Sequence, residues 1–114
     1  MSLSTHVLDA ALGNPAQGVH VVLFRLATDG WNRCAEGRTD TDGRLRPADD
    51  AGRAIDLERG IYRLDFDTGA YFTATNQVGF YPQVCVTFEV TDPAAHHHVP
   101  LLLSPFAYST YRGS

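Results

Sequence analysis

The sequence contains no lysine, and its nine basic residues, all arginine, are set against 13 acidic ones for a formal net charge of −4. It therefore lacks a basic surface of the kind that binds a phosphate backbone, and we expect no nucleic-acid partner. No apolar run approaches the roughly 20 residues of a membrane span, and the N-terminus lacks the basic and apolar regions of a signal peptide. These absences predict a cytoplasmic protein with no membrane partner.

Cysteine is also scarce, since only Cys34 and Cys85 are present. Two thiols in a chain without an export signal are more often reduced than paired, so a structural disulfide is the less favoured interpretation. The length of 114 residues and the apolar share of 44% predict a single globular domain spanning 1–114. The chain has no glycine-rich phosphate loop, nucleophile elbow or paired-carboxylate motif.

Turn residues recur at short intervals and divide the chain into short apolar or alternating segments. Tyr62, Leu64 and Phe66 alternate with polar residues, which is typical of a half-buried strand. The segment 19–26 is largely apolar on both alternating faces, so we expect a strand covered on both sides. Many short strands predict an all-β sandwich or barrel. The predicted strands are 4–9, 19–26, 62–67, 84–90 and 97–103, and the one predicted helix lies near 69–77.

Five histidines are candidates for chemistry, because imidazole exchanges protons near neutral pH. In a strand, His96 and His98 point to one face and His97 to the other, so the three cannot bind one metal ion together. Zinc on His96 and His98 would need a third ligand, and no other ligand lies at a recognised spacing. We interpret His20 and His97 as structural, like most isolated histidines.

Two further features concern Arg44 and the C-terminal end. Arg44 follows Asp42-Gly43 in a hairpin-like turn, where composition alone favours a solvated side chain. The segment 107–114 contains two tyrosines and an arginine, whereas most chain ends fray into small polar residues. We therefore expect this end of the chain to be held in place.

Several strings resemble one known family along the whole chain. They are THVLD (5–9), TDGR (41–44), TGAYFTATN (68–76), HVPLLLSPF (98–106) and above all YSTYRGS (108–114). The chain is similar in these strings to the 5-hydroxyisourate hydrolases, also called transthyretin-related proteins. The final YRGS separates these enzymes from the transthyretins proper, which share the fold but end differently.

The resemblance implies a transthyretin-like two-sheet β-sandwich of about eight strands with one short helix. It also implies a homotetramer, a dimer of dimers, with active sites in a channel where the dimers meet. We expect the apolar outer faces of strands, such as the strand with Leu101 and Leu103, to serve this assembly.

The implied activity is the hydrolysis of 5-hydroxyisourate to 2-oxo-4-hydroxy-4-carboxy-5-ureidoimidazoline in urate degradation, without a cofactor or a metal. Water attack on the cyclic amide passes through an oxyanion, so a base and a fixed positive charge are needed. Either His6 or His98 can be that base, and Arg44 supplies the charge. The implied catalytic residues are His6, Arg44, His98 and Ser114, and the implied substrate-binding residues are His6, Arg44, Tyr111, Arg112 and Gly113.

Two other functions compete with this one. A transthyretin-like protein could bind a small aromatic ligand without turning it over, since a fold does not determine a function. A β-sandwich interaction module with incidental histidines is the other alternative. The set His6, Arg44, His98 and YRGS argues against the carrier, because a passive apolar channel gains nothing from burying such groups. The absence of an export signal and the anchored C-terminal segment argue against the interaction module.

Overall fold

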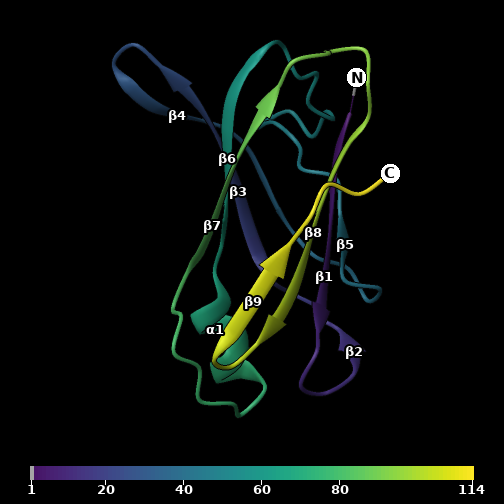
Figure 1. Cartoon of the computed structure of the whole chain (residues 1–114), viewed down its shortest axis with the longest axis vertical. Coiled ribbons are helices and arrows are strands. Elements are labelled where there is room, and N and C mark those ends of the chain that lie inside the picture. The colour runs from purple at the N-terminus through teal and green to yellow at the C-terminus, as the bar shows by residue number, and fades with distance from the viewer. Residues whose placement is uncertain (1) are drawn as a thin grey trace.

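Two β-sheets packed face to face make up most of the computed structural model, which describes residues 2–114 (Figure 1). The first sheet has the order β2-β1-β8-β9, with β5 also paired to β1, and the second has the order β4-β3-β6-β7. The strands of the first sheet are β1 (Leu3–Asp9), β2 (Asn14–Pro15), β5 (Arg44–Leu45), β8 (His97–Ser104) and β9 (Ala107–Thr110). Those of the second are β3 (His20–Ala27), β4 (Gly30–Arg38), β6 (Gly60–Phe66) and β7 (Val84–Val90).

These sheets confirm the prediction of an all-β sandwich with one short helix. The helix α1 (Thr68–Ala74) begins after Asp67, whose carboxylate accepts a hydrogen bond from the Ala70 N–H. It ends before Asn76, which has a φ of 57°. None of the helices in residues 2–114 is long and apolar enough to cross a membrane.

The sequence patterns did not predict β4 and β9 as strands. In β4 only Ala35 is buried, and in β9 every residue is exposed, so neither strand shows the alternation of apolar and polar residues that marks a half-buried strand. Both lie at sheet edges, where pairing with one neighbour is enough to form the strand. Pairing of β9 with β8 confirms that the C-terminal segment is held in place.

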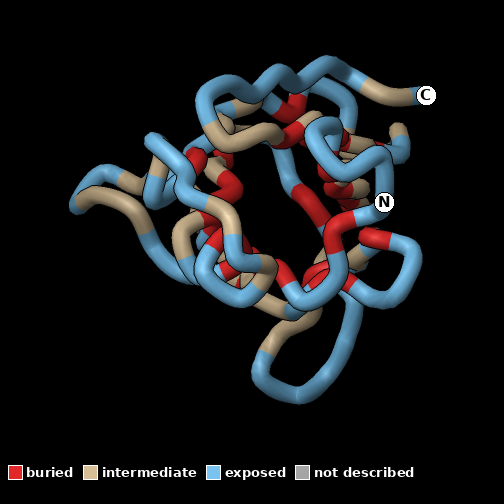
Figure 2. Tube along the Cα trace, turned by 90° about the horizontal axis from the view of Figure 1, so that it is seen from below, coloured by how far each residue is buried: buried red, intermediate tan, exposed pale blue. Residues whose placement is uncertain are grey.

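The core lies between the two sheets, where the buried positions of the strands face each other (Figure 2). The predicted alternation in β6 is confirmed, because Tyr62, Leu64 and Phe66 are all buried. Leu101 and Leu103 also point into this core and are 0% exposed, so the expectation that they form an outer face is wrong. The run Leu101-Leu102-Leu103 is apolar throughout, and its inward side cannot be read from alternation.

The outward face of β3 is shielded in part by a side chain of its own sheet. The Arg63 guanidinium, from the neighbouring strand β6, lies 4.8 Å from the Phe24 ring centroid. The same guanidinium lies 4.7 Å from the Trp31 ring centroid. A cation over two aromatic faces shields part of this apolar surface from water.

A buried carboxylate at the end of β1 connects the first sheet to α1. Asp9 is 1% exposed and accepts hydrogen bonds from the Tyr71 hydroxyl (2.7 Å) and the Gln77 side-chain amide (3.0 Å). Burial alone would raise the pKa of Asp9, but these bonds, with those from the backbone N–H groups of Leu12 and Ala11, outweigh it and lower the pKa.

We expect Tyr71→Phe to lower the free energy of unfolding by about 1.5–3 kcal/mol, because it removes a hydrogen bond to a buried charge. Since the folded-state pKa of Asp9 is depressed, this stabilisation is present above its unfolded pKa of about 3.9 and disappears as the pH falls through the folded value. Urea denaturation at pH 7 and pH 3 measures both effects. Tyr108→Phe is the control, and equal stability of the two variants at pH 7 would contradict the role of Asp9.

Candidate active site

The strand register brings two of the predicted site residues together on the outward face of the first sheet. In the antiparallel pair of β1 and β5, His6 lies directly opposite Arg44. Cross-strand neighbours of this kind have their Cβ atoms about 4.5–5.5 Å apart and share one face. His6 and Arg44, 38 positions apart along the chain, thus meet through a two-residue strand that no periodic pattern could reveal.

The turn before Arg44 is built to approach β1 closely. Gly43 has a φ of +75° and accepts a hydrogen bond from the Val7 N–H, and a Cβ there would lie 2.3 Å from the Val7 carbonyl oxygen. The Asp40 carboxylate accepts hydrogen bonds from the N–H groups of Asp42 (2.8 Å) and Arg44 (3.0 Å). Because only glycine fits at position 43, the close approach of this turn to β1 fixes the backbone position of Arg44.

His98 lies on the same outward face, beside Ser4, which precedes His6 by two residues on β1. In the parallel pair of β1 and β8, Ser4 is the partner of His98, and the Ser4 hydroxyl lies 2.7 Å from His98 Nδ1. Burial lowers the pKa of His98 below the usual imidazole value, and the nearby positive charge of Arg44 lowers it further, with smaller contributions from His96 and His6. The neutral, proton-accepting form of His98 is thereby favoured.

Hydrogen bonding leaves one nitrogen of each imidazole available. His6 Nε2 lies 2.9 Å from the Asp42 carbonyl oxygen, which only accepts, so a neutral His6 carries its proton on Nε2 and leaves Nδ1 free. His98 uses Nδ1 toward Ser4 and has Nε2 free. Two candidate proton acceptors therefore belong to the same face.

Arg44 also borders a cavity of about 420 Å³ beside this face. Arg38 and Arg46 line the same cavity, with Asp40 as its acidic member. Such a cluster attracts an anion, and the planar guanidinium can donate paired hydrogen bonds to it.

Residues near the C-terminus also contact His98. The Gly113 N–H donates to the His98 carbonyl oxygen over 2.9 Å. A Cβ at Gly113 would lie 2.3 Å from the imidazole Cδ2, so a glycine is needed for this packing. Ser114 follows directly and is exposed, and Tyr111 is 58% exposed.

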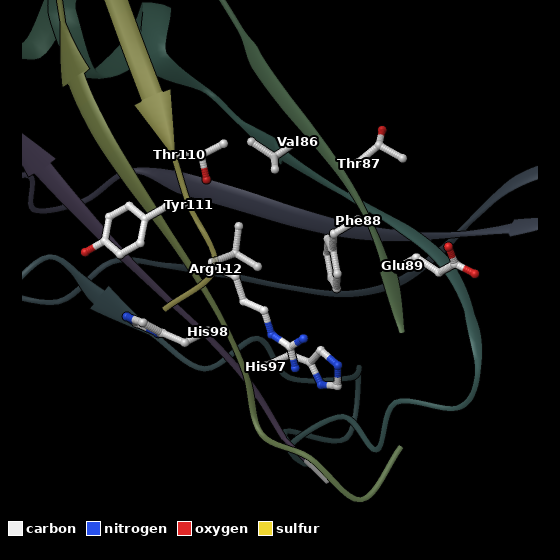
Figure 3. Close-up of a pocket in the computed structure, with 10 residues that line it drawn as sticks. Val86, Thr87, Phe88, Glu89, His97, His98, Thr110, Tyr111 and Arg112 are labelled. Carbon is white, nitrogen blue, oxygen red and sulfur yellow. The ribbon is translucent and has the colours of Figure 1, made fainter. Parts of the chain in front are cut away.

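Arg112 lies on the opposite side of the C-terminal segment from Tyr111. Figure 3 shows the Tyr111 ring and the His98 imidazole on one side, and the Arg112 guanidinium beside the His97 imidazole on the other. A cavity of about 250 Å³ between β7 and β8 is lined by His98, Tyr111 and Arg112 together, with His97 and Phe88 also among its lining residues. The structure thus brings His6, Arg44 and His98 onto one face, and Arg112 shares a cavity with His98 while its guanidinium lies beside His97.

The remaining histidines and the cysteines have separate surroundings. His20 Nε2 lies 2.6 Å from a Glu36 carboxylate oxygen on the neighbouring strand. His97 is 6% exposed, and its Nδ1 has no hydrogen-bond partner among residues 2–114. Burial lowers its pKa, and so does the charge of Arg112. Both cysteines are free, and residues 2–114 contain no cluster of three His, Cys, Asp or Glu able to hold a metal ion.

Comparison with known proteins gives matches along nearly the whole chain. The profile of the HIUase/Transthyretin family matches residues 3–113. The 5-hydroxyisourate hydrolase of Salmonella typhimurium is 44% identical over 112 residues, which cover 98% of this chain and 80% of that protein.

Two proteins with different functions have solved structures of the same fold. The 5-hydroxyisourate hydrolase of Klebsiella pneumoniae superposes with a TM-score of 0.84 at 35% identity, covering 100% of both chains. Sea bream transthyretin, solved in complex with thyroxine, superposes with a TM-score of 0.86 at 32% identity, covering 99% of this chain and 95% of that one. The sandwich is therefore transthyretin-like, as expected, and the chain belongs to the HIUase/Transthyretin family.

Proposed function

We propose that this protein is a 5-hydroxyisourate hydrolase, which opens the six-membered ring of its substrate to form 2-oxo-4-hydroxy-4-carboxy-5-ureidoimidazoline. The observation that carries the proposal is the meeting of His6, Arg44 and His98 on one outward face of the first sheet. The chain that carries these three residues is 44% identical to the 5-hydroxyisourate hydrolase of Salmonella typhimurium. No cofactor is part of the proposal.

In the proposed mechanism an imidazole takes the proton of the attacking water. His98 suits this role, because burial and Arg44 hold its pKa below the ordinary value and its hydrogen bond to Ser4 uses Nδ1 rather than Nε2. His6 is the other member of the acid/base pair, with Nδ1 free. General base catalysis of this kind typically contributes about 10² to 10⁴ in rate.

Arg44 is proposed to bind the oxygen-rich edge of the substrate and to stabilise the oxyanion of the tetrahedral intermediate. Its place in a cavity with two further arginines favours an anionic ligand. The turn fixed by Asp40 and Gly43 holds the backbone of Arg44 opposite His6.

The C-terminal tetrapeptide is proposed to complete the site. Gly113 keeps the chain against His98, and Tyr111 shares the side of the segment on which His98 lies. Ser114 follows Gly113 directly and lies in the neighbourhood of His98, where its hydroxyl can orient an imidazole or the attacking water. For Arg112 to bind substrate, its side chain must turn from its place beside His97.

We further propose a homotetramer, a dimer of dimers, with the sites in a channel between dimers. Within residues 2–114, β7 and β9 each pair with a single strand, and such edges can extend a sheet into a second copy. Phe80 and Phe106, exposed by 69% and 71%, also support association. Light scattering tests this assembly, and a fully active monomer would contradict it.

The competing proposal is a carrier of a small aromatic ligand, as in the sea bream transthyretin solved with thyroxine. An apolar channel would suit such a ligand. The outward face here carries His6, Arg44 and His98 instead, all of which need polar partners in the bound state. This favours turnover over carriage.

The deciding experiment follows the ultraviolet decay of freshly generated 5-hydroxyisourate, made with urate oxidase, in the presence and absence of the protein. The compound decays unaided, so only acceleration above that background counts. We expect acceleration proportional to protein concentration, unaffected by His20→Gln. A folded protein that binds the compound but leaves its decay rate unchanged would support the carrier instead.

A further inference from the structure

Four side chains form a continuous hydrogen-bonded row on the outward face of the first sheet. His98 Nδ1 lies 2.7 Å from the Ser4 hydroxyl, and that hydroxyl lies 2.9 Å from His96 Nε2. His96 Nδ1 in turn lies 2.5 Å from the Ser2 hydroxyl. Hydroxyl and imidazole alternate, so every group can both accept and donate a proton.

The register of two parallel strands produces this order. Ser4 is the β1 partner of His98, and the His97 N–H donates to the Ser2 carbonyl oxygen over 2.9 Å, which extends the pairing to Ser2. Side chains two residues apart share a face, so Ser2 and Ser4 stand beside His96 and His98. The two imidazole planes are 18° apart, with centroids separated by 6.4 Å.

The row leads from the proposed site to the surface. His98 is half-buried, whereas His96 is exposed, as is the hydrogen bond between His96 and Ser2. The charged and titratable groups whose electrostatic effect lowers the pKa of His98 are Arg44 from β5, His96 from the same row and His6 from β1. Positive charge on His98 is thus disfavoured by its neighbours, and a path to a more exposed imidazole begins at its Nδ1.

We propose that Ser4, His96 and Ser2 conduct the proton taken up by His98 to solvent during each turnover. This inference rests on the proposed function. Hydrolysis of a cyclic amide consumes one water and yields a carboxylic acid, which is ionised at neutral pH because its pKa is about 3–4. One proton must therefore leave the site in each cycle.

The transfer balances as a shift of protons along the row. His98 accepts a proton on Nε2 and releases its Nδ1 proton to the Ser4 oxygen, while the Ser4 hydroxyl proton passes to His96 Nε2. The Nδ1 proton of His96 passes to Ser2, whose own proton leaves to water. The second proton of the attacking water passes through His6 to the leaving ring nitrogen, so the product is a carboxylate and one proton has gone to solvent. After product release His98 Nε2 faces bulk water, and the resting tautomers are restored as one proton enters at Ser2 and the Nε2 proton passes to that water.

Ser4 and His96 are thus positioning residues that act through His98. We expect Ser4→Ala and His96→Gln each to lower kcat by on the order of 10-fold with KM little changed, since general base catalysis remains and only proton removal slows. Ser4→Thr, which keeps the hydroxyl, should restore kcat. His20→Gln is the matched control, because His20 is also a partly exposed, hydrogen-bonded histidine.

Two readouts separate proton conduction from a structural role. Added small buffer bases should raise kcat of Ser4→Ala but not of the wild type, because a diffusing base replaces the missing row. In ¹⁵N NMR titrations, which need no substrate, the curves of His96 and His98 should be coupled in the wild type and independent in Ser4→Ala. Independent curves in the wild type, or a kcat that neither Ser4→Ala nor His96→Gln lowers, would overturn the proposal.

These readouts also distinguish the failure of the inference from the failure of the proposed function. If the wild type does not accelerate the decay of 5-hydroxyisourate, the proposed function fails, and with it the conduction of protons during turnover. Coupled titration would then show only that the row exists. Clear turnover with a loss in Ser4→Ala that buffer bases do not rescue would instead overturn conduction while leaving the hydrolase intact.

Discussion

Replacing His98 with alanine is expected to lower kcat/KM for 5-hydroxyisourate by about 10²- to 10⁴-fold, the usual contribution of a general base. The His98 imidazole has a lowered pKa and a hydroxyl partner, Ser4, that orients it on the outward face. Initial rates of ultraviolet decay above the spontaneous background measure the effect. His20→Ala serves as the control, since its partner Glu36 lies on the second sheet.

The pH profile gives an independent check on the same residue. The base must be neutral, so activity is present above the pKa of His98 and disappears as the pH falls through it. Because burial and the charge of Arg44 lower this pKa, half of the activity should remain at a pH below the ordinary value of about 6.5. A rate that is flat from pH 5 to 8, or an active His98→Ala, would remove His98 from the role of base.

Replacing Arg44 with alanine is expected to lower kcat by about 10²- to 10³-fold, comparable to the loss of one donor to an oxyanion. Arg44→Lys keeps the charge but loses the planar pair of donors, so its activity should lie between those of the wild type and Arg44→Ala. The same decay assay measures both variants.

Arg46→Ala is the matched control for Arg44, because both side chains line the same cavity. Only Arg44 lies opposite His6 in the strand register. If positive charge in the cavity were all that mattered, the two alanine variants would lose similar activity. Equal losses would therefore contradict the assignment of oxyanion stabilisation to Arg44.

Much of the fold could be predicted from local patterns. The alternation of Tyr62, Leu64 and Phe66 marked β6 correctly, and the turn residues correctly separated most of the strands. The segments β4 and β9 gave no such signal, because edge strands with few buried residues do not need alternation. Similarly, the apolar run in β8 did not reveal that Leu101 points inward.

For the site, local reasoning found the residue types but not their neighbours. It placed His96 and His98 on one face correctly, yet composition alone favoured a solvated Arg44 without a role. The resemblance in YRGS and in the strings around His6, Arg44 and His98 supplied the set of residues. Neither route indicated Ser4 as the partner of His98, because nothing in the sequence links positions 94 residues apart.

The sequence by itself determined the class of fold, the family and the residues able to move protons or hold a charge, since these depend on local alternation, turn chemistry and side-chain type. Tertiary structure alone decided which of them meet. The parallel register of β1 and β8 places Ser4 beside His98, and the turn at Gly43 places Arg44 opposite His6. Strand pairing between distant segments is set by the packing of the whole sandwich, so no local stretch of sequence contains it.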